Sequence, residues 1–360
     1  MRTASNTRRD ALAYGVGQTA RIGWYLGHYV ATRRWFAKIE PDHRPSTLRG
    51  RVAEIRVQAA LVREGLALLK RDFDNVQAGH YPMPRNLIPN PAAALAGAVR
   101  YWRDLPDVTL RRRLGTAQEP FEGANRTHNE GRYPRYYLQN FHYQSGGWLT
   151  DESAALYDTQ VEILFGGVAD AMRRQALVPI AEWLAARGHD ASDAGTTLLD
   201  LGCGTGNMLS LVREAFPDIT LSGLDLSEAY LARAKRRLRD PEISWHAAAA
   251  EQIPLPDRSV DLVTAVYLFH ELPRKVRAQV LSEAARVLKP GGRFVLVDAL
   301  QTGDIPALDP VVASFPKQFH EPYFQDWIDS DLAPMFETAG LRMTAQIPAY
   351  LSKVFVGERA

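Results

Sequence analysis

A short apolar strand that runs directly into a glycine-rich loop is the feature that most constrains the fold. Residues 197–200 read Thr-Leu-Leu-Asp, and Leu-Gly-Cys-Gly-Thr-Gly follows at 201–206. Gly202, Gly204 and Gly206 allow positive φ and a close approach of a ligand to the main chain. The spacing G-x-G-x-G differs from the G-x-G-x-x-G of dinucleotide-binding loops, which place a pyrophosphate on a helix N-terminus. The segment therefore predicts a ligand site between a first strand and a first helix.

From residue 196 onward, strand and helix patterns alternate. We predict strands at 197–200, 219–224, 243–248, 260–266 and 293–299, and helices at 207–215, 228–238, 275–288 and 330–339. Strands that alternate with helices of this length form a parallel sheet with helices on both faces. The last two strands, 341–347 and 351–356, are joined only by a proline-containing turn, so we expect that pair to be antiparallel. The fold class is α/β.

The N-terminal part has a different pattern and the opposite charge. Residues 1–150 carry 23 Lys and Arg against 12 Asp and Glu, a net charge of +11, whereas residues 151–360 carry 20 against 29, a net charge of −9. Such asymmetry indicates two electrostatically distinct domains. We expect a basic, mainly helical substrate or cap domain at 1–150, connecting helices at 151–195 and the α/β domain at 196–360. The expected helices are 11–38, 50–72, 92–103 and 151–187. We expect Pro41 and Pro45 to interrupt the chain after the first, and we expect a break at Gly166-Gly167 and another around Pro179 in the last.

The composition excludes several classes of protein. No uninterrupted apolar run reaches about 18 residues, so a membrane-spanning helix is not expected. The Arg8-Arg9 pair is not followed by a segment apolar enough for an export signal. The single cysteine, Cys203, excludes an internal disulfide framework and a multi-cysteine metal site. These features fit a cytoplasmic protein.

Further motifs follow the glycine loop in a fixed order. They are Leu-Asp-Leu-Ser at 224–227, Ala-Glu-Gln-Ile-Pro-Leu-Pro-Asp at 250–257 and Arg-Val-Leu-Lys-Pro-Gly-Gly at 286–292. With Asp-Leu-Gly-Cys-Gly-Thr-Gly at 200–206, this series resembles the class I S-adenosylmethionine-dependent methyltransferases, in particular the small-molecule branch that contains the ubiquinone and menaquinone C-methyltransferases. The resemblance implies a Rossmann-like seven-stranded sheet of order 3-2-1-4-5-7-6 with the last strand antiparallel, and S-adenosylmethionine as cofactor.

The resemblance also implies roles for individual residues. Asp200, Gly202, Gly204 and Gly206 would lie along the methionine end of the cofactor, Asp225 would accept hydrogen bonds from the ribose hydroxyls, and Leu226 would pack on the adenine. Family members often carry an acid near the adenine amino group, where this chain has Ala249. Ala250 and Glu251 are therefore the expected adenine contacts. Cys203, a small loop residue, and Tyr267, at the end of the fourth strand, complete the expected cofactor site.

The acceptor is expected beyond the carboxyl ends of the first and fourth strands, next to residues 267–273. His270 is a candidate for a general base, a group that orients the acceptor, or a packing residue, and Glu271 beside it is a second catalytic candidate. The pair begins no H-E-x-x-H motif, because Leu-Pro-Arg follows, so no metal site is expected. Two aromatic runs, 133–144 and 318–324, either frame the acceptor pocket or pack in the core; Tyr143 in the first run is the third catalytic candidate.

The leading functional hypothesis is methyl transfer to a small or lipid-like acceptor, such as a quinone or another aromatic compound. The alternatives are N-, O- or S-methylation of a soluble natural product or metabolite, and a catalytically inactive cofactor-binding protein. Nucleic-acid methylation is not expected, since no D/N-P-P-Y/F motif follows the fourth strand. The helix at 11–38 combines Trp24, Tyr25, Trp35 and Phe36 with Arg21, Arg33 and Arg34, a mixture that predicts peripheral contact with anionic membrane.

Overall fold

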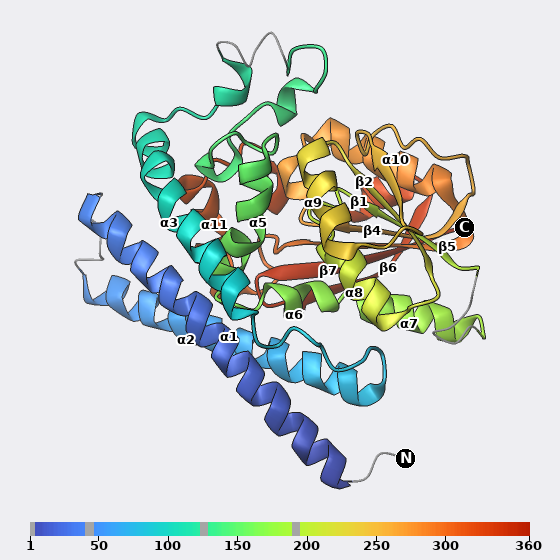
Figure 1. The fold of residues 1–360 in the computed structure, drawn as a ribbon, viewed down its shortest axis with the longest axis horizontal. Coiled ribbons are helices and arrows are strands. Elements are labelled where there is room, and N and C mark those ends of the chain that lie inside the picture. The colour runs from blue at the N-terminus through green and yellow to red at the C-terminus, as the bar shows by residue number, and fades with distance from the viewer. Residues whose placement is uncertain (1–3, 40–46, 123–128, 189–194) are drawn as a thin grey trace.

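A seven-stranded sheet forms the centre of the C-terminal part of the molecule (Figure 1). The computed structural model describes residues 4–39, 47–122, 129–188 and 195–360. The strands are β1 (Thr197–Leu201), β2 (Thr220–Asp225), β3 (Ser244–Ala247), β4 (Val260–Val266), β5 (Leu288–Ala299), β6 (Leu341–Ala349) and β7 (Ser352–Arg359). Their order is β3-β2-β1-β4-β5-β7-β6, and β7 is antiparallel to both β5 and β6. The predicted fold class, strand order and antiparallel last strand are confirmed.

The central strands are buried on both faces, which explains their nearly continuous apolar sequence. Leu198 and Leu262 point into one core layer, and their chain neighbours Leu199 and Val263 point into the other. The first layer is closed by α7 (Leu177–Ala186), α8 (Asn207–Ala215) and α9 (Glu228–Leu238), and the second by α10 (Arg274–Val287), α12 (Phe324–Ile328) and α13 (Ala333–Thr338). The parallel strands β1 and β4 therefore end side by side at one edge, where the glycine loop begins.

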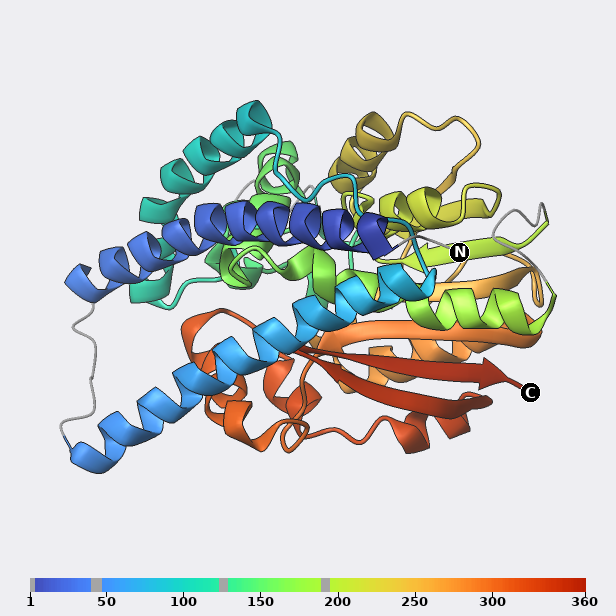
Figure 2. The ribbon, with the colours of Figure 1, turned by 90° about the horizontal axis from the view of Figure 1, so that it is seen from below.

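The N-terminal part is helical. It consists of α1 (Ala4–Ile39), α2 (Leu48–Ala78), α3 (Pro91–Leu114), α5 (Asp151–Leu164) and α6 (Ala169–Arg174). Figures 1 and 2 show α1 and α2 as two long helices whose ends extend past the α/β body. Helix α1 packs on α5, and α2 packs on α6 and on the short helix η5 (Pro306–Leu308), so α2 contacts the α/β part directly.

Two buried polar networks attach these long helices to α5 and α6. The Arg21 guanidinium of α1 lies 2.7 Å from a carboxylate oxygen of Glu162 and 2.7 Å from one of Asp170. Asp72 of α2 accepts hydrogen bonds from Arg174 of α6, at 2.6 Å and 2.8 Å, and from the hydroxyl of Tyr14 at 2.5 Å. Buried charges are tolerated only when they are paired in this way, so these contacts specify how the helices dock.

Several boundaries differ from the sequence-based expectation. The third helix extends from Pro91 to Leu114 rather than ending near 103, with Pro106 inside it. The break expected around Pro179 lies at residues 175–176, between α6 and α7, and Pro179 itself lies in the first turn of α7, where a missing N–H costs no helical hydrogen bond. Pro41 and Pro45 lie outside the described residues.

The surface of α1 bears on the expected membrane contact. Within residues 4–39, 47–122, 129–188 and 195–360, no helix is long and apolar enough to cross a membrane. Arg21 and Tyr25 are buried, so neither side chain is available to a membrane surface: Arg21 pairs with Glu162 of α5 and donates to the backbone oxygen of Gly167, and its guanidinium lies over the Tyr25 ring. Trp24 and Trp35 are each 37% exposed and are available to a surface.

Candidate active site

The loop between β1 and α8 is held in a left-handed conformation that only glycine adopts without strain. Gly202, Gly204 and Gly206 have φ of 60°, 54° and 80°. A Cβ on Gly202 would lie 3.0 Å from Leu268, and one on Gly206 would lie 3.0 Å from Leu238, so both glycines also allow close packing. A Cβ on Gly204 would meet no atom closer than 3.9 Å. Gly202 and Gly204 line a cleft above the loop, whereas Gly206 packs against α9.

Asp225, the last residue of β2, faces the same cleft. Its carboxylate accepts hydrogen bonds from the backbone N–H of Gly204 and of Ser227, each at 2.8 Å. Burial raises the pKa of Asp225 to about 6, although these N–H donors favour the ionised form. Leu226, Ala250 and Glu251 also line the cleft. The residues expected at the ribose and the adenine are therefore close together in space.

Two of the expected cofactor contacts lie beneath the loop rather than in the cleft. Asp200 is 2% exposed, and its carboxylate accepts a hydrogen bond of 2.7 Å from the Thr264 hydroxyl. Burial raises the pKa of Asp200 to about 7. Cys203 is buried next to Gly223, and burial raises the pKa of its thiol. Neither side chain lines the cleft, so their positions fit a role in holding the loop.

Aromatic side chains enclose the cleft from the N-terminal side. Tyr136, Tyr137, Trp148 and Tyr157 line it together with Tyr230 of α9. The Tyr136 hydroxyl donates a hydrogen bond of 2.7 Å to the Glu251 carboxylate, and the Ser227 hydroxyl donates one of 2.5 Å to the backbone oxygen of Trp148. The aromatic run at 133–144 therefore contributes to the site. Sequence reasoning did not single out Trp148 and Tyr157, because no motif marks them.

A second, larger cavity of about 470 Å³ adjoins the cleft. Its walls are mainly apolar side chains of α1, α2, α5 and α11 (Asp309–Gln318), which lies in the insertion after β5. Leu26, Leu66 and Phe315 are examples. The cavity shares Tyr157, Tyr267 and Glu271 with the cleft, so the two spaces meet at these three side chains.

His270 faces the larger cavity and not the cleft. It belongs to a short helix, η4 (Phe269–Glu271), that follows β4, and its Nδ1 lies 2.5 Å from Oδ1 of the buried Asp298 at the end of β5. Burial opposes a positive charge on the ring, but the Asp298 carboxylate outweighs it and raises the pKa of His270 to about 9. The ring is therefore an imidazolium at neutral pH. Burial and the charge of Glu321 raise the pKa of Glu271 well above its ordinary value.

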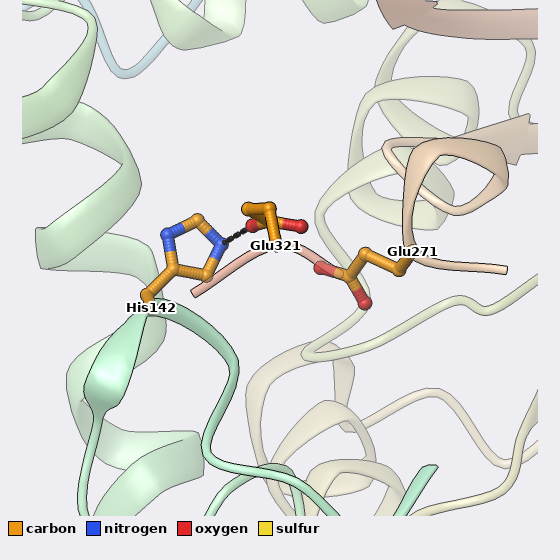
Figure 3. A group of neighbouring side chains, drawn as sticks. All are labelled: His142, Glu271 and Glu321. Atoms are coloured by element: carbon orange, nitrogen blue, oxygen red, sulfur yellow. Dashed lines mark ion pairs between the residues drawn. The ribbon is translucent and has the colours of Figure 1, made fainter. Parts of the chain in front are cut away.

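Three side chains from distant parts of the chain converge where the two spaces meet. The ligating atoms of His142, Glu271 and Glu321 all lie within 4.8 Å of one another (Figure 3). His142 Nε2 is 2.7 Å from Oε1 of Glu321. Tyr143, the predicted catalytic residue next to His142, lines neither cavity; its ring packs on His320. These three residues form no sequence motif, so no local pattern marks the cluster.

Comparison with known proteins agrees with this geometry. Residues 198–292 match a family model described as "Methyltransferase domain". The chain is 37% identical over 109 residues to the ubiquinone/menaquinone biosynthesis C-methyltransferase of Desulfotalea psychrophila, an alignment that covers 30% of this chain and 44% of that protein. It is 39% identical over 111 residues to the 27-O-demethylrifamycin SV methyltransferase of Amycolatopsis mediterranei, covering 30% of this chain and 40% of that protein.

These relatives match over less than half of their own length, and their names point to different acceptors. Among solved structures, a SAM dependent methyltransferase from Aquifex aeolicus aligns with a TM-score of 0.38 and 21% identity, covering 52% of this chain and 93% of that one. The residues that match the family model, 198–292, include the glycine loop and the strand ends that line the cleft.

Proposed function

Because the part of this chain from β1 to β7 is a class I S-adenosylmethionine-dependent methyltransferase domain, we propose that the chain transfers the methyl group of that cofactor to an apolar, lipid-like or aromatic acceptor. The observation that carries the proposal is the continuity of two spaces. A cleft over the glycine loop, which contains the carboxylates of Asp225 and Glu251, meets a cavity of about 470 Å³ with mainly apolar walls.

The residues of the cleft fit the cofactor. The open face of Gly204 leaves room for a ligand to approach the main chain of the loop, and Asp225 keeps acceptor capacity for ribose hydroxyls beside its two bonds to backbone N–H groups. Leu226 offers apolar surface to an adenine, and main-chain groups of Ala250 and Glu251 lie at the same cleft to contact its polar edge. The bound cofactor supplies an electrophilic methyl group on a sulfonium.

The walls of the larger cavity favour an apolar acceptor. A cavity of this size lies within the range of small-molecule sites, roughly 300–1,000 Å³. Aliphatic and aromatic side chains from four helices form most of its surface, and burying an acceptor's apolar surface against them provides binding energy. Tyr157, Tyr267 and Glu271 lie at the junction, where a reacting atom would face the methyl group.

The chemical demands on the protein are modest. The sulfonium loses its charge when the methyl group leaves, so alignment and exclusion of water supply most of the rate. His270 lines the acceptor cavity, and its imidazolium is held by Asp298. In our proposal His270 donates a hydrogen bond to an acceptor oxygen and orients it; it does not contact the cofactor.

The test combines a cavity-filling substitution with an assay for S-adenosylhomocysteine. Ala299→Leu adds bulk to the wall of the larger cavity, and Ala278→Leu makes the same change on the exposed face of α10. We expect acceptor-dependent formation of S-adenosylhomocysteine from a panel of quinones, phenols and fatty acids. Ala299→Leu should suppress it while leaving cofactor affinity intact, and Ala278→Leu should have no effect. Equal turnover in the two variants would place the acceptor elsewhere.

A further inference from the structure

We propose that His142, Glu271 and Glu321 bind a divalent metal ion, of the kind represented by Mn²⁺ or Zn²⁺, at the junction of the cleft and the apolar cavity. Glu271 lines both spaces and His142 lines the cavity, so open coordination positions of the ion would face the acceptor. An anionic or carbonyl oxygen of the acceptor is the ligand expected there. This last step rests on the proposed methyl transfer, whereas metal binding itself does not.

The spacing of the three side chains suits one ion. Bonds of about 2.0–2.2 Å allow two ligand atoms on one ion to be at most about 4.3 Å apart. The three ligating atoms lie within 4.8 Å of one another, so small rotations of the side chains bring them into range. Two carboxylates and one imidazole form a mixed oxygen and nitrogen donor set, which suits a borderline divalent ion better than Ca²⁺.

Glu321 provides an independent indication of a missing cation. The residue is 4% exposed, and its Oε2 has no hydrogen-bond partner among the described residues. Its Oε1 has only the contact with His142 Nε2 at 2.7 Å. An ionised carboxylate in such a place is costly unless a cation or donors compensate it. Figure 3 shows Glu321 between the other two side chains, where an ion would contact all three.

The neighbouring basic groups are already paired with other carboxylates. Asp298 is balanced by His270, whose Nδ1 lies 2.5 Å away, and the Arg277 guanidinium pairs with Asp326. Among the residues that the structure describes, the ion pair given for Glu271 is a long one, with His270 Nε2 at 3.9 Å. Glu271 and Glu321 therefore share a site in which a ring nitrogen of His142 lies within 4.8 Å of both carboxylates.

The loops that carry His142 and Glu321 are bound to each other. The backbone N–H of His142 donates to the backbone oxygen of His320 at 3.2 Å, and the His320 ring lies 2.7 Å from the side-chain oxygen of Gln139. His142 and Tyr143 both have positive φ, 55° and 58°. Two successive residues other than glycine in this region are strained, and such strain is typical of functional sites. The strained turn directs His142 toward Glu321.

The test uses the full chain after a chelator has removed bound metal. Calorimetry measures binding of Mn²⁺ and, separately, of Zn²⁺, and electron paramagnetic resonance measures the free Mn²⁺. We expect one ion per chain. Glu321→Gln and His142→Gln should each weaken binding at least about 100-fold, since even the outer partners of metal ligands contribute about 10–100-fold. Glu337→Gln, a matched change at an exposed acid of α13, should leave affinity unchanged.

Thermal unfolding and cofactor titration of the same variants show whether they fold. If neither ion binds at millimolar concentration, or if both variants keep full affinity, the inference is overturned. Binding of a protonated alkylamine without any metal binding also overturns it, because the carboxylates would then serve a cationic acceptor. Metal binding by a chain that fails to bind S-adenosylmethionine would instead overturn the proposed function and leave the metal site intact.

Discussion

Replacement of Asp225 by asparagine tests the cofactor site most directly. The carboxylate accepts two backbone hydrogen bonds of 2.8 Å, from Gly204 and Ser227. An asparagine offers one oxygen, so one of the two N–H groups loses its acceptor and faces an NH₂ group. The variant also loses the charge that strengthens hydrogen bonds from ribose hydroxyls. Hydrogen bonds to charged groups contribute about 1.5–3 kcal/mol each, so we expect a loss of about 2 kcal/mol in cofactor binding.

A loss of about 2 kcal/mol corresponds to a Kd for S-adenosylmethionine that is about 30-fold higher. Isothermal calorimetry on the wild type and on Asp225→Asn measures it. Asp218→Asn, the same change at an exposed position before β2, is the control and should retain wild-type affinity. A Kd for Asp225→Asn within about threefold of wild type, a difference of less than about 0.7 kcal/mol, would refute the assignment of Asp225 to the cofactor.

The pH dependence of the same equilibrium provides a second readout. Burial raises the pKa of Asp225 to about 6 in the folded chain. Donors from a ligand favour the ionised carboxylate, so binding lowers this pKa, and affinity should increase as pH rises through about 6. The contribution to folding stability has the opposite sign. Because the folded pKa is above the unfolded one, that contribution is complete below about pH 4 and is lost as pH rises through about 6. Calorimetry at about pH 5 and about pH 7.5 should show tighter binding at the higher pH, and Asp225→Asn should lack most of this difference.

Three further expectations concern the acceptor side and the helical part. His270→Ala should leave cofactor affinity within about threefold of wild type but lower turnover. The loss of turnover should be about 10²–10⁴-fold if the ring transfers a proton, and smaller if the ring only orients the acceptor. Unchanged steady-state kinetics would show that His270 is a packing residue. Arg21→Leu removes the closest cation from the Glu162 carboxylate, leaves Arg173 as its remaining ion-pair partner, and should lower the free energy of unfolding by about 3 kcal/mol in urea denaturation. Arg63→Leu, at an exposed pair, should cost less than about 1 kcal/mol. The chain should sediment with anionic vesicles at low salt, and Ala at both Trp24 and Trp35 should reduce this; equal recovery with neutral vesicles would contradict membrane contact.

The sheet was predictable because local patterns and topology agree there. Leu198 and Leu199 belong to a strand buried on both faces, and such strands appear in sequence as apolar runs followed by glycine. Asp225 was predictable for the same reason, since a polar residue that ends a buried strand lies at the ligand-binding edge of a parallel sheet.

The acceptor side could not be derived in this way because it depends on contacts between distant segments. His142 and Glu321 are separated by most of the α/β domain and meet only because the loop at 139–143 binds the insertion after β5. The left-handed backbone at His142 and Tyr143 determines which of the two rings faces the cavity. Neither residue type predicts a left-handed backbone, so the sequence gives no sign of this turn. The position of Asp200 beneath the glycine loop could not be predicted for a related reason. Its carboxylate accepts a hydrogen bond from Thr264 on the neighbouring strand, and strand pairing is not visible in a local motif.

The two long N-terminal helices connect the acceptor cavity with the outer surface. Leu26 of α1 and Val62 and Leu66 of α2 line the cavity, yet they are 43%, 63% and 63% exposed. Exposed apolar side chains that continue into a cavity provide a path for an apolar molecule from the surface to the reaction site. If the helices also contact anionic membrane, an acceptor dissolved in the bilayer reaches the cavity without crossing water. In that case both features contribute to acceptor uptake: the basic N-terminal part binds the chain to the anionic membrane that contains the acceptor, and the apolar cavity receives the acceptor.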